Sequence, residues 1–212
     1  MPDDAAPEDE RDGATLSLRA ARKAENRRLI VAAGRAVFAE IGLDAATVRD
    51  IVRASGLAQG SFYNYFDSKE AVFSVIVDEV VTPIRARLKE ARAAATTADA
   101  FIGGCYRACV ALTAQDYAAA ALIRRNQAAF RAAFYQGDDL AGAVLRELVE
   151  DLEAAVARGL FAPHDAPLMA EMMLSAGVDL IIACLNAPEQ TERRLAFLQT
   201  TFETALTPSR QA

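Results

Sequence analysis

The chain has 212 residues, of which 53% are hydrophobic and 25% are charged, and its formal net charge is −6. A chain of this length forms one or two globular domains and buries a core without needing disulfides or metals. The acidic balance argues against a protein that is basic over its whole surface. Three cysteines, an odd number, give no disulfide framework and suit a reducing compartment. We therefore expect a cytoplasmic protein.

The sequence also argues against membrane and enzyme classes. The longest apolar stretch, Leu168 to Leu185, contains Glu171 and Asp179, which makes it a poor membrane span. The acidic N-terminus has no apolar segment of the kind found in signal peptides. With one histidine, no Glu-x-x-His pair, no glycine-rich phosphate loop and no Gly-x-Ser-x-Gly motif, the chain predicts no catalytic residue, metal site or cofactor.

Charge and composition divide the chain into three parts. Residues 1–20 form an acidic N-terminal tail without a periodic pattern of apolar residues, and they are expected to be disordered. Residues 21–70 are expected to be one helical domain, and residues 71–212 a second. Within 14–70 there are nine basic and six acidic residues, so the only excess of positive charge lies near the front of the chain. Such an excess fits polyanion binding, although it also fits an ordinary solvated surface.

Three helices are predicted in the first domain. Ile30, Val37 and other apolar residues recur at helical spacing over 22–41, and Gly42 follows as a left-handed cap. Thr47 is placed to cap a short helix over 48–54, with Asp50 completing an imperfect capping box. A tight turn at Gly56 then leads into a third helix over 58–65. Two short helices joined by a three-residue turn form a helix-turn-helix unit.

The string TVRDIVRASGLAQGSFYNYFDSKEA over 47–71 closely resembles the DNA-binding signature of the TetR family of transcriptional regulators, and LIVAAGRAVFAEIG over 29–42 resembles that family's first helix. The resemblance implies that 47–66 reads DNA, with the second helix of the unit in the major groove. At its start many relatives have Ser or Thr where this chain has Ala58, which leaves the helix without a side-chain cap.

The resemblance assigns individual DNA contacts. Base-edge or groove contacts are implied for Gln59, Ser61 and Asn64, a guanine or phosphate contact for Arg49, and phosphate contacts for Thr47, Tyr63, Tyr65 and Lys69. Two alternatives stay open for these residues: Tyr65 is also expected to be partly core, and Arg49 could pair with a neighbouring acid. Gly60 either permits a close approach to the duplex or merely sits in a first turn.

The second domain is predicted to be helical throughout. Ser68 caps a helix that Pro83 kinks or ends near Thr82. Further helices are predicted over 98–114, 116–134, 138–159, 165–186 and 189–206.

The resemblance also implies a homodimer and an effector cavity in the second domain. Two helices from each subunit would form the dimer bundle, which suits a palindromic operator. The residues expected there recur at three-to-four spacing and are Leu168, Met172, Ser175, Ala176, Asp179, Ile182, Ala183, Leu195, Leu198 and Phe202. Asp179 either binds across the interface or reaches a ligand, or it is a partly exposed helix position. The candidate effector contacts are Phe101, Tyr106, Tyr117, Arg124, Gln127, Phe130 and Phe134, for which core packing is the alternative. Cys105 and Cys109 share a helix face, either as small buried hydrophobes or as a redox pair.

These observations predict an all-α protein with an N-terminal helix-turn-helix DNA-binding domain and a C-terminal helical ligand-binding and dimerisation domain. The predicted function is a sequence-specific transcriptional regulator, a repressor that an unknown small-molecule effector releases from double-stranded DNA. The alternative is a helical ligand-binding or adaptor protein that no longer reads DNA.

Overall fold

The computed structural model describes residues 8–136 and 140–207, and every regular element in these ranges is a helix. The predicted all-α fold class is therefore confirmed. The helices are α1 (Glu8–Ile41), α2 (Val48–Ser55), α3 (Gln59–Phe62), α4 (Lys69–Ala94), α5 (Ala98–Gln115), α6 (Tyr117–Arg125), α7 (Gln127–Gln136), α8 (Leu140–Ala157), α9 (Ala166–Asn186), a 3₁₀ turn (Pro188–Gln190) and α10 (Thr191–Leu206).

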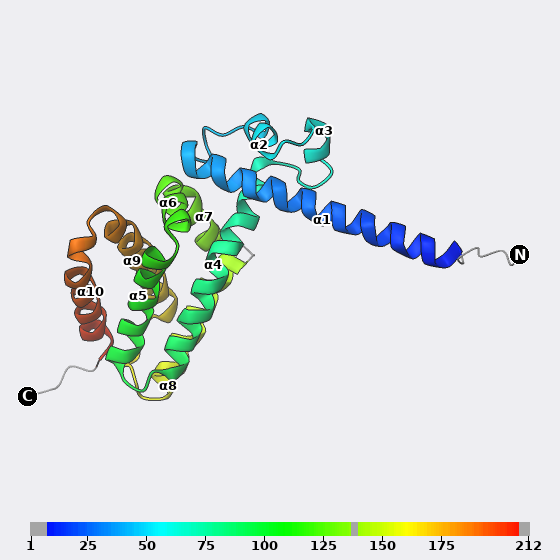
Figure 1. Ribbon diagram of the computed structural model, residues 1–212. Coiled ribbons are helices and arrows are strands. Elements are labelled where there is room, and N and C mark those ends of the chain that lie inside the picture. Colours follow the sequence, from blue (N-terminus) through cyan, green and yellow to red (C-terminus); the bar gives the residue numbers. More distant parts are fainter. Residues whose placement is uncertain (1–7, 137–139, 208–212) are drawn as a thin grey trace, which may run out of the picture.

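We call α1–α3 the head and α4–α10 the body. In Figure 1, α4 descends from the head into the body, where α5 and α8 pack against it, while α6 and α7 lie beneath α1. Helix α9 packs on α5 and α8, and α10 covers α5 and α9 on the side away from α4. Helix α1 runs past α2 and α3, so that its N-terminal half projects away from the rest of the molecule (Figure 1).

The first helix is longer than the sequence pattern predicts. It begins at Glu8 rather than near residue 22, so the expected disordered tail is wrong for residues 8–20, and residues 1–7 lie outside the described ranges. The physical reason is helix propensity: eight of residues 8–20 are Ala, Leu, Arg or Glu, which favour helix.

The caps of the head follow the sequence closely. Thr47 accepts a hydrogen bond from the backbone N–H of Asp50, and the Asp50 carboxylate accepts from the backbone N–H of Thr47, which completes the predicted capping box. The same contact lowers the pKa of Asp50, because the Thr47 hydroxyl and backbone N–H both donate to its carboxylate. Gly42 and Gly56 have φ of 84° and 70°, the left-handed conformation predicted for both.

Helix α3 is shorter than predicted. It covers Gln59–Phe62, and residues 63–65 form a turn instead of continuing to Tyr65. Ala58 makes no side-chain cap hydrogen bond, as expected from its missing hydroxyl. A single turn of helix gains little from its own hydrogen bonds, so the shape of this segment depends on its packing.

Two predictions about helix breaks in the body were wrong. Pro83 does not end α4: the helix continues through the exposed proline to Ala94, and Val80, Val81 and Ile84 pack inward on either side of it. Conversely, the helix predicted over 116–134 is divided at Asn126, which turns out of helical geometry with φ −122° and ψ 37°.

The other predicted helices of the body were close to those observed. Ser68 caps α4 and Asp165 caps α9, each accepting a hydrogen bond from the backbone N–H three residues on. The predicted start at residue 138 lies outside the described residues.

One buried core runs through head and body. Phe38 of α1 lies edge-on to Phe73 of α4, and Phe73 lies edge-on to Phe130 of α7, with ring centroids 5.5 Å apart in both pairs. All three rings are buried. The head is thus connected to the interior of the body by a continuous row of aromatic side chains.

Helix α9 alone among the described residues has the length and apolar composition to cross a membrane. In this fold it packs against α5, α8 and α10, and its Asp179 forms an ion pair with Arg131 of α7. Such contacts are typical of a core helix in a globular protein, and core helices can be as long and as apolar as membrane spans.

Candidate nucleic-acid interface and internal cavity

The segment after Gly56 has one buried face and one polar face. Phe62 and Phe66, four residues apart, are both buried with ring centroids 6.2 Å apart, as their spacing predicts. Gln59, Tyr63 and Asn64 are exposed on the other side, and Tyr63 is 55% exposed. The two rings therefore fix the segment from within while leaving its amide side chains free to contact a ligand.

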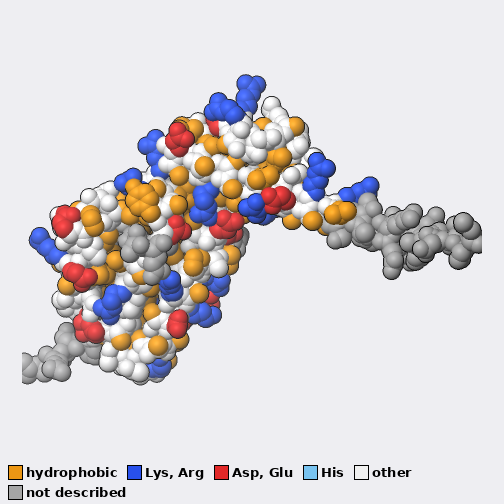
Figure 2. Space-filling model, in the orientation of Figure 1, with side chains coloured by type: hydrophobic (Ala, Val, Ile, Leu, Met, Phe, Trp, Pro, Cys, Tyr) orange, Lys and Arg blue, Asp and Glu red, His pale blue; other side chains and the backbone are white. Residues whose placement is uncertain are grey.

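Helix α2 adds two of the predicted residues beside this segment. Thr47 and Arg49 are both exposed. Among the described residues Arg49 has no ion-pair partner, whereas Arg53 on the same helix pairs with Asp50. Lys and Arg side chains gather on the outer side of the head and along the projecting part of α1 (Figure 2).

The projecting part of α1 contributes basic residues that the motif does not include. Arg19, Arg22 and Lys23 line a shallow recess together with Ser61 and Asn64. Across the same recess, the Asn26 side-chain amide donates to the hydroxyl of Tyr65 at 3.1 Å. The structure therefore brings Ser61, Asn64 and Tyr65 close to three basic side chains. The sequence pattern had placed these three outside the DNA-reading segment 47–66. Their signal was the excess of basic residues over 14–70.

Lys69, for which the resemblance implies a phosphate contact, binds backbone carbonyls of the chain itself when no DNA is present. Its ammonium donates to the backbone carbonyls of Leu43 at 2.8 Å, Asp44 at 3.3 Å and Ala46 at 2.9 Å. An ammonium has three N–H donors, and these carbonyls occupy all three. Lys69 thus holds the loop between α1 and α2 and has no free donor for a phosphate in this conformation.

Gly60 offers a direct test of close approach to a duplex. No described atom lies within 4 Å of the position that a Cβ would take, so alanine fits the free protein. We expect Gly60→Ala to leave stability unchanged or raise it by up to about 1 kcal/mol, since alanine favours helix more than glycine does. We also expect it to weaken DNA binding in a gel-shift assay, because the new methyl group would meet the backbone of the duplex. Unchanged DNA affinity would mean that the glycine merely occupies a first turn.

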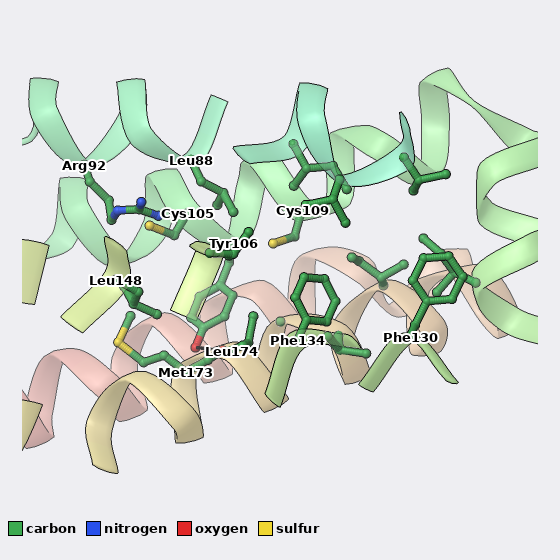
Figure 3. Close-up of a pocket in the computed structure, with 18 residues that line it drawn as sticks. Leu88, Arg92, Cys105, Tyr106, Cys109, Phe130, Phe134, Leu148, Met173 and Leu174 are labelled. Carbon is green, nitrogen blue, oxygen red and sulfur yellow. Dashed lines mark hydrogen bonds between the residues drawn. The ribbon is translucent and has the colours of Figure 1, made fainter. Parts of the chain in front are cut away.

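The body encloses a cavity between α4, α5, α7, α8 and α9. Its volume is about 70 Å³. About 10–15 Å³ on that measure holds one water, so several small groups fit without rearrangement. Of the predicted effector contacts, Tyr106, Phe130 and Phe134 line it (Figure 3).

The other predicted effector contacts lie elsewhere. Phe101 is buried against Phe161, with ring centroids 5.2 Å apart, and serves the core. Tyr117 is 76% exposed, and Arg124 and Gln127 are exposed on the outer side of α6 and α7. These four side chains therefore do not line the cavity.

Most of the cavity lining was missed from sequence because it comes from helices far apart in the chain. The additional residues are Val80, Val81, Ile84, Leu88, Arg92, Cys105, Cys109, Ile123, Val144, Leu148, Met173, Leu174, Gly177, Val178 and Ile181. Their signal, apolar residues at helical spacing, marks burial but not which buried faces leave space between them.

The two cysteines of α5 are buried in the cavity wall and are poor candidates for a redox switch. Burial raises the pKa of the Cys105 thiol to about 11, against the opposing effect of the nearby Arg92 guanidinium, and raises that of Cys109 to about 12. Thiolates are the reactive form, so both thiols are held in the unreactive form at neutral pH. This favours the interpretation of small buried hydrophobes.

We expect iodoacetamide at pH 8 to alkylate Cys105 and Cys109 at least about 100-fold more slowly in the folded protein than in denaturant, since each pKa is raised by about two units or more. Arg107 lies between them, so tryptic peptides report each thiol separately. Because the folded state holds these protons more tightly, stability should also fall as pH rises above about 9. Equal labelling rates with and without denaturant would contradict the burial.

The outer face of α9 and α10 is partly apolar. Leu168, Met172 and Phe197 are exposed, the last by 69%. Three members of the predicted dimer series, Ile182, Leu195 and Phe202, are instead buried within the chain. Asp179 pairs with Arg131, which also donates to the Ser175 hydroxyl at 3.1 Å. Large exposed apolar side chains on two adjacent helices are typical of a protein interface.

The described residues contain no group of three or more His, Cys, Asp or Glu side chains that could hold a metal ion. The arrangement instead offers two distinct binding features. One is a polar, basic outer face on the head, and the other is an apolar cavity in the body.

Comparisons with known proteins match this arrangement. Residues 30–76 match the family model of bacterial regulatory proteins, tetR family. The HTH-type transcriptional repressor KstR2 of Rhodococcus jostii is 53% identical over 45 residues, which are 21% of this chain and 20% of that protein. Five curated relatives, KstR2 among them, are each matched over only 20–31% of their own lengths.

Solved structures extend the likeness in fold to nearly the whole chain. A protein of Shewanella sp. PV-4 assigned to the tetR family of transcription regulators has a TM-score of 0.67 at 14% identity, over 86% of this chain and 98% of that one. The regulator FadR of Bacillus subtilis, solved in complex with stearoyl-CoA, has a TM-score of 0.61 at 18% identity, over 82% of this chain and 97% of that one.

Proposed function

We propose, from the match of residues 30–76 to the family model of bacterial regulatory proteins, tetR family, that the chain is a DNA-binding transcriptional repressor whose operator affinity is lowered by a small molecule bound in the body. The observation that carries the proposal is the segment after Gly56. Its phenylalanines are buried, and its amide side chains Gln59 and Asn64 face outward.

The chemistry of the head supports DNA as the ligand. Gln and Asn side chains pair bidentately with adenine in the major groove, which is wide enough to admit a helix. Thr47, Arg49 and Tyr63 lie beside them on the exposed side of the head and supply phosphate contacts that fix the register. Arg19, Arg22 and Lys23 add positive charge along the adjoining helix, so the protein binds DNA despite a net charge of −6.

The cavity supports a small-molecule effector, and its walls connect it to the head. Ile123 of α6 lines the cavity, and three residues later the Asn126 side chain contacts the end of α1: it accepts from the backbone N–H of Leu43 at 2.7 Å and donates to the carbonyl of Phe38 at 2.9 Å. The row from Phe130 through Phe73 to Phe38 makes a second connection. A ligand that moves α6 or α7 would therefore shift the head.

A homodimer in the cytoplasm completes the proposal. The exposed apolar side chains Leu168, Met172 and Phe197 on α9 and α10 would meet their counterparts in a second copy across a two-fold axis. Two heads related by that axis would read the two halves of a palindromic operator in successive turns of the major groove. The named relatives are regulators, which agrees with a binding protein rather than an enzyme.

The test is a footprint of the purified protein on the promoter of its own gene, with light scattering to measure its size. We expect protection of a palindrome, by a dimer, with an affinity that falls steeply as salt is raised. Binding no tighter than to random DNA would reject the repressor. If the protein still bound small apolar molecules, the result would support the alternative of a helical ligand-binding protein that no longer reads DNA.

A further inference from the structure

Arg92 of α4 is a charged side chain in an otherwise apolar cavity. The residue is 3% exposed and lines the cavity beside Leu88, Cys105 and Leu148 (Figure 3). Among the described lining residues the other polar group of note is the Tyr106 hydroxyl, which donates to the backbone carbonyl of Met173 at 3.4 Å. Burying a charge is costly unless it is paired and hydrogen-bonded, so the partners of Arg92 decide what the cavity accepts.

Within the chain, Arg92 forms an ion pair through only one of the three nitrogens of its guanidinium. Its Nε donates to Oδ2 of Asp151 on α8 at 2.5 Å, and the Asp151 side chain is 36% exposed. Arginine has five N–H donors, so this bond leaves the two terminal nitrogens without a carboxylate among the described residues. The Arg92 side chain also interacts with the Cys105 thiol in the cavity wall, and sulfur accepts hydrogen bonds only weakly.

The position of Arg92 gives the cavity a polar end and an apolar end. In Figure 3 the guanidinium lies beside Cys105 at one end, while Phe130 and Phe134 lie at the opposite end. The walls between them are aliphatic and aromatic. A ligand that fills this space must therefore carry its hydrogen-bond acceptor at one terminus and an apolar body behind it.

We propose that the effector is an elongated apolar molecule with one terminal carboxylate, which the terminal nitrogens of Arg92 bind. The planar guanidinium matches the two oxygens of a carboxylate, and such charge-assisted pairs are stronger than neutral hydrogen bonds. In this arrangement Asp151 stays exposed to solvent and keeps its bond to the Nε of Arg92, while the ligand carboxylate binds the terminal nitrogens. An amine at the same terminus would meet a buried cation and be rejected. The assignment deepens the proposed function, because it names the ligand class of its effector site.

The same two helices supply a matched control. Arg85, seven residues before Arg92 on α4, pairs with Glu147, four residues before Asp151 on α8, and its terminal nitrogen lies 2.5 Å from the Glu147 carboxylate. This pair lies outside the cavity lining. Replacing Arg85 thus removes an arginine–carboxylate pair between the same helices without touching the cavity.

Isothermal titration of the full chain without DNA tests the assignment, using decanoate, decanol and decylamine as probes. We expect decanoate to bind most tightly, Arg92→Met to weaken decanoate by about tenfold or more, and Arg85→Met to leave it unchanged. Asp151→Asn should tighten decanoate by about threefold or more, because it removes the carboxylate that competes for the guanidinium. Circular dichroism checks the fold of each variant.

The carboxylate assignment can be wrong even where the proposed DNA-binding function is right. Equal binding of decylamine and decanoate, or no binding of decanoate to the unaltered chain, would overturn the carboxylate assignment even if DNA binding is confirmed. If Arg92→Met does not fold, weaker decanoate binding by Asp151→Asn would overturn it instead. Arg92-dependent binding that leaves the operator complex intact would support this ligand site and reject the release mechanism.

Discussion

Replacing Gln59 and Asn64 together by alanine is expected to reduce operator affinity by about 30-fold to 10⁴-fold, since each bidentate amide–adenine pair contributes about 1–3 kcal/mol of discrimination. Both side chains are exposed, so the free energy of unfolding should change by less than about 0.5 kcal/mol. Competition gel shifts against random DNA would measure the loss, which should fall on specific binding and spare non-specific binding.

A matched control is available on the body. Gln127 and Asn186 are exposed amides far from the head along the chain, and their double alanine variant removes the same two side-chain types. It should bind the operator as the unaltered chain does. Equal losses in the two double variants would mean that the amides of the segment after Gly56 do not read bases, and the proposed recognition surface would have to lie elsewhere on the head.

The head could be predicted from sequence because its determinants are local. Thr47 and Asp50 are three residues apart, Phe62 and Phe66 are four apart, and Gly42 and Gly56 end their helices in the left-handed conformation. Each of these relations lies within one turn of chain, where spacing alone decides which groups can meet. The exception was Lys69, whose three acceptors lie 23–26 residues earlier in the chain and carry no side-chain signal.

The body was harder to predict because its site is assembled from distant segments. Arg92 and Asp151 are 59 residues apart, and a charged residue in a helix is ordinarily read as exposed. Asn126 is likewise a common exposed residue type, yet its burial breaks one predicted helix into α6 and α7. Arg124 and Gln127, on either side of that break, are exposed, while Phe130 and Phe134 line the cavity. Periodicity could locate the helices but not their mutual contacts.

The second large effect is expected at Asn126. Its side chain is buried and bridges two helices, because it binds the backbone of Phe38 and Leu43 in the head as well as the carbonyl of Leu122 in α6 at 2.8 Å. Asn126→Ala removes all three hydrogen bonds. We expect it to lower the free energy of unfolding by about 2–4 kcal/mol, because each buried polar group left unsatisfied costs about 1–3 kcal/mol. Urea denaturation measures this loss, with Gln127→Ala as the neighbouring exposed control.

Amide hydrogen exchange separates a local effect from a global one. The Leu43 N–H donates to the Asn126 side chain, whereas the Gly42 N–H donates to the carbonyl of Phe38 at 3.1 Å and does not depend on Asn126. In Asn126→Ala, exchange at Leu43 should therefore accelerate more than exchange at Gly42. If both amides accelerate equally, the variant has lost only overall stability. If neither does, the side chain does not join the head to the body. Since Ile123 lines the cavity one turn before this bridge, selective loosening at Leu43 would show that α6 holds the end of α1 in place. That is the contact through which a ligand in the cavity would act on the head.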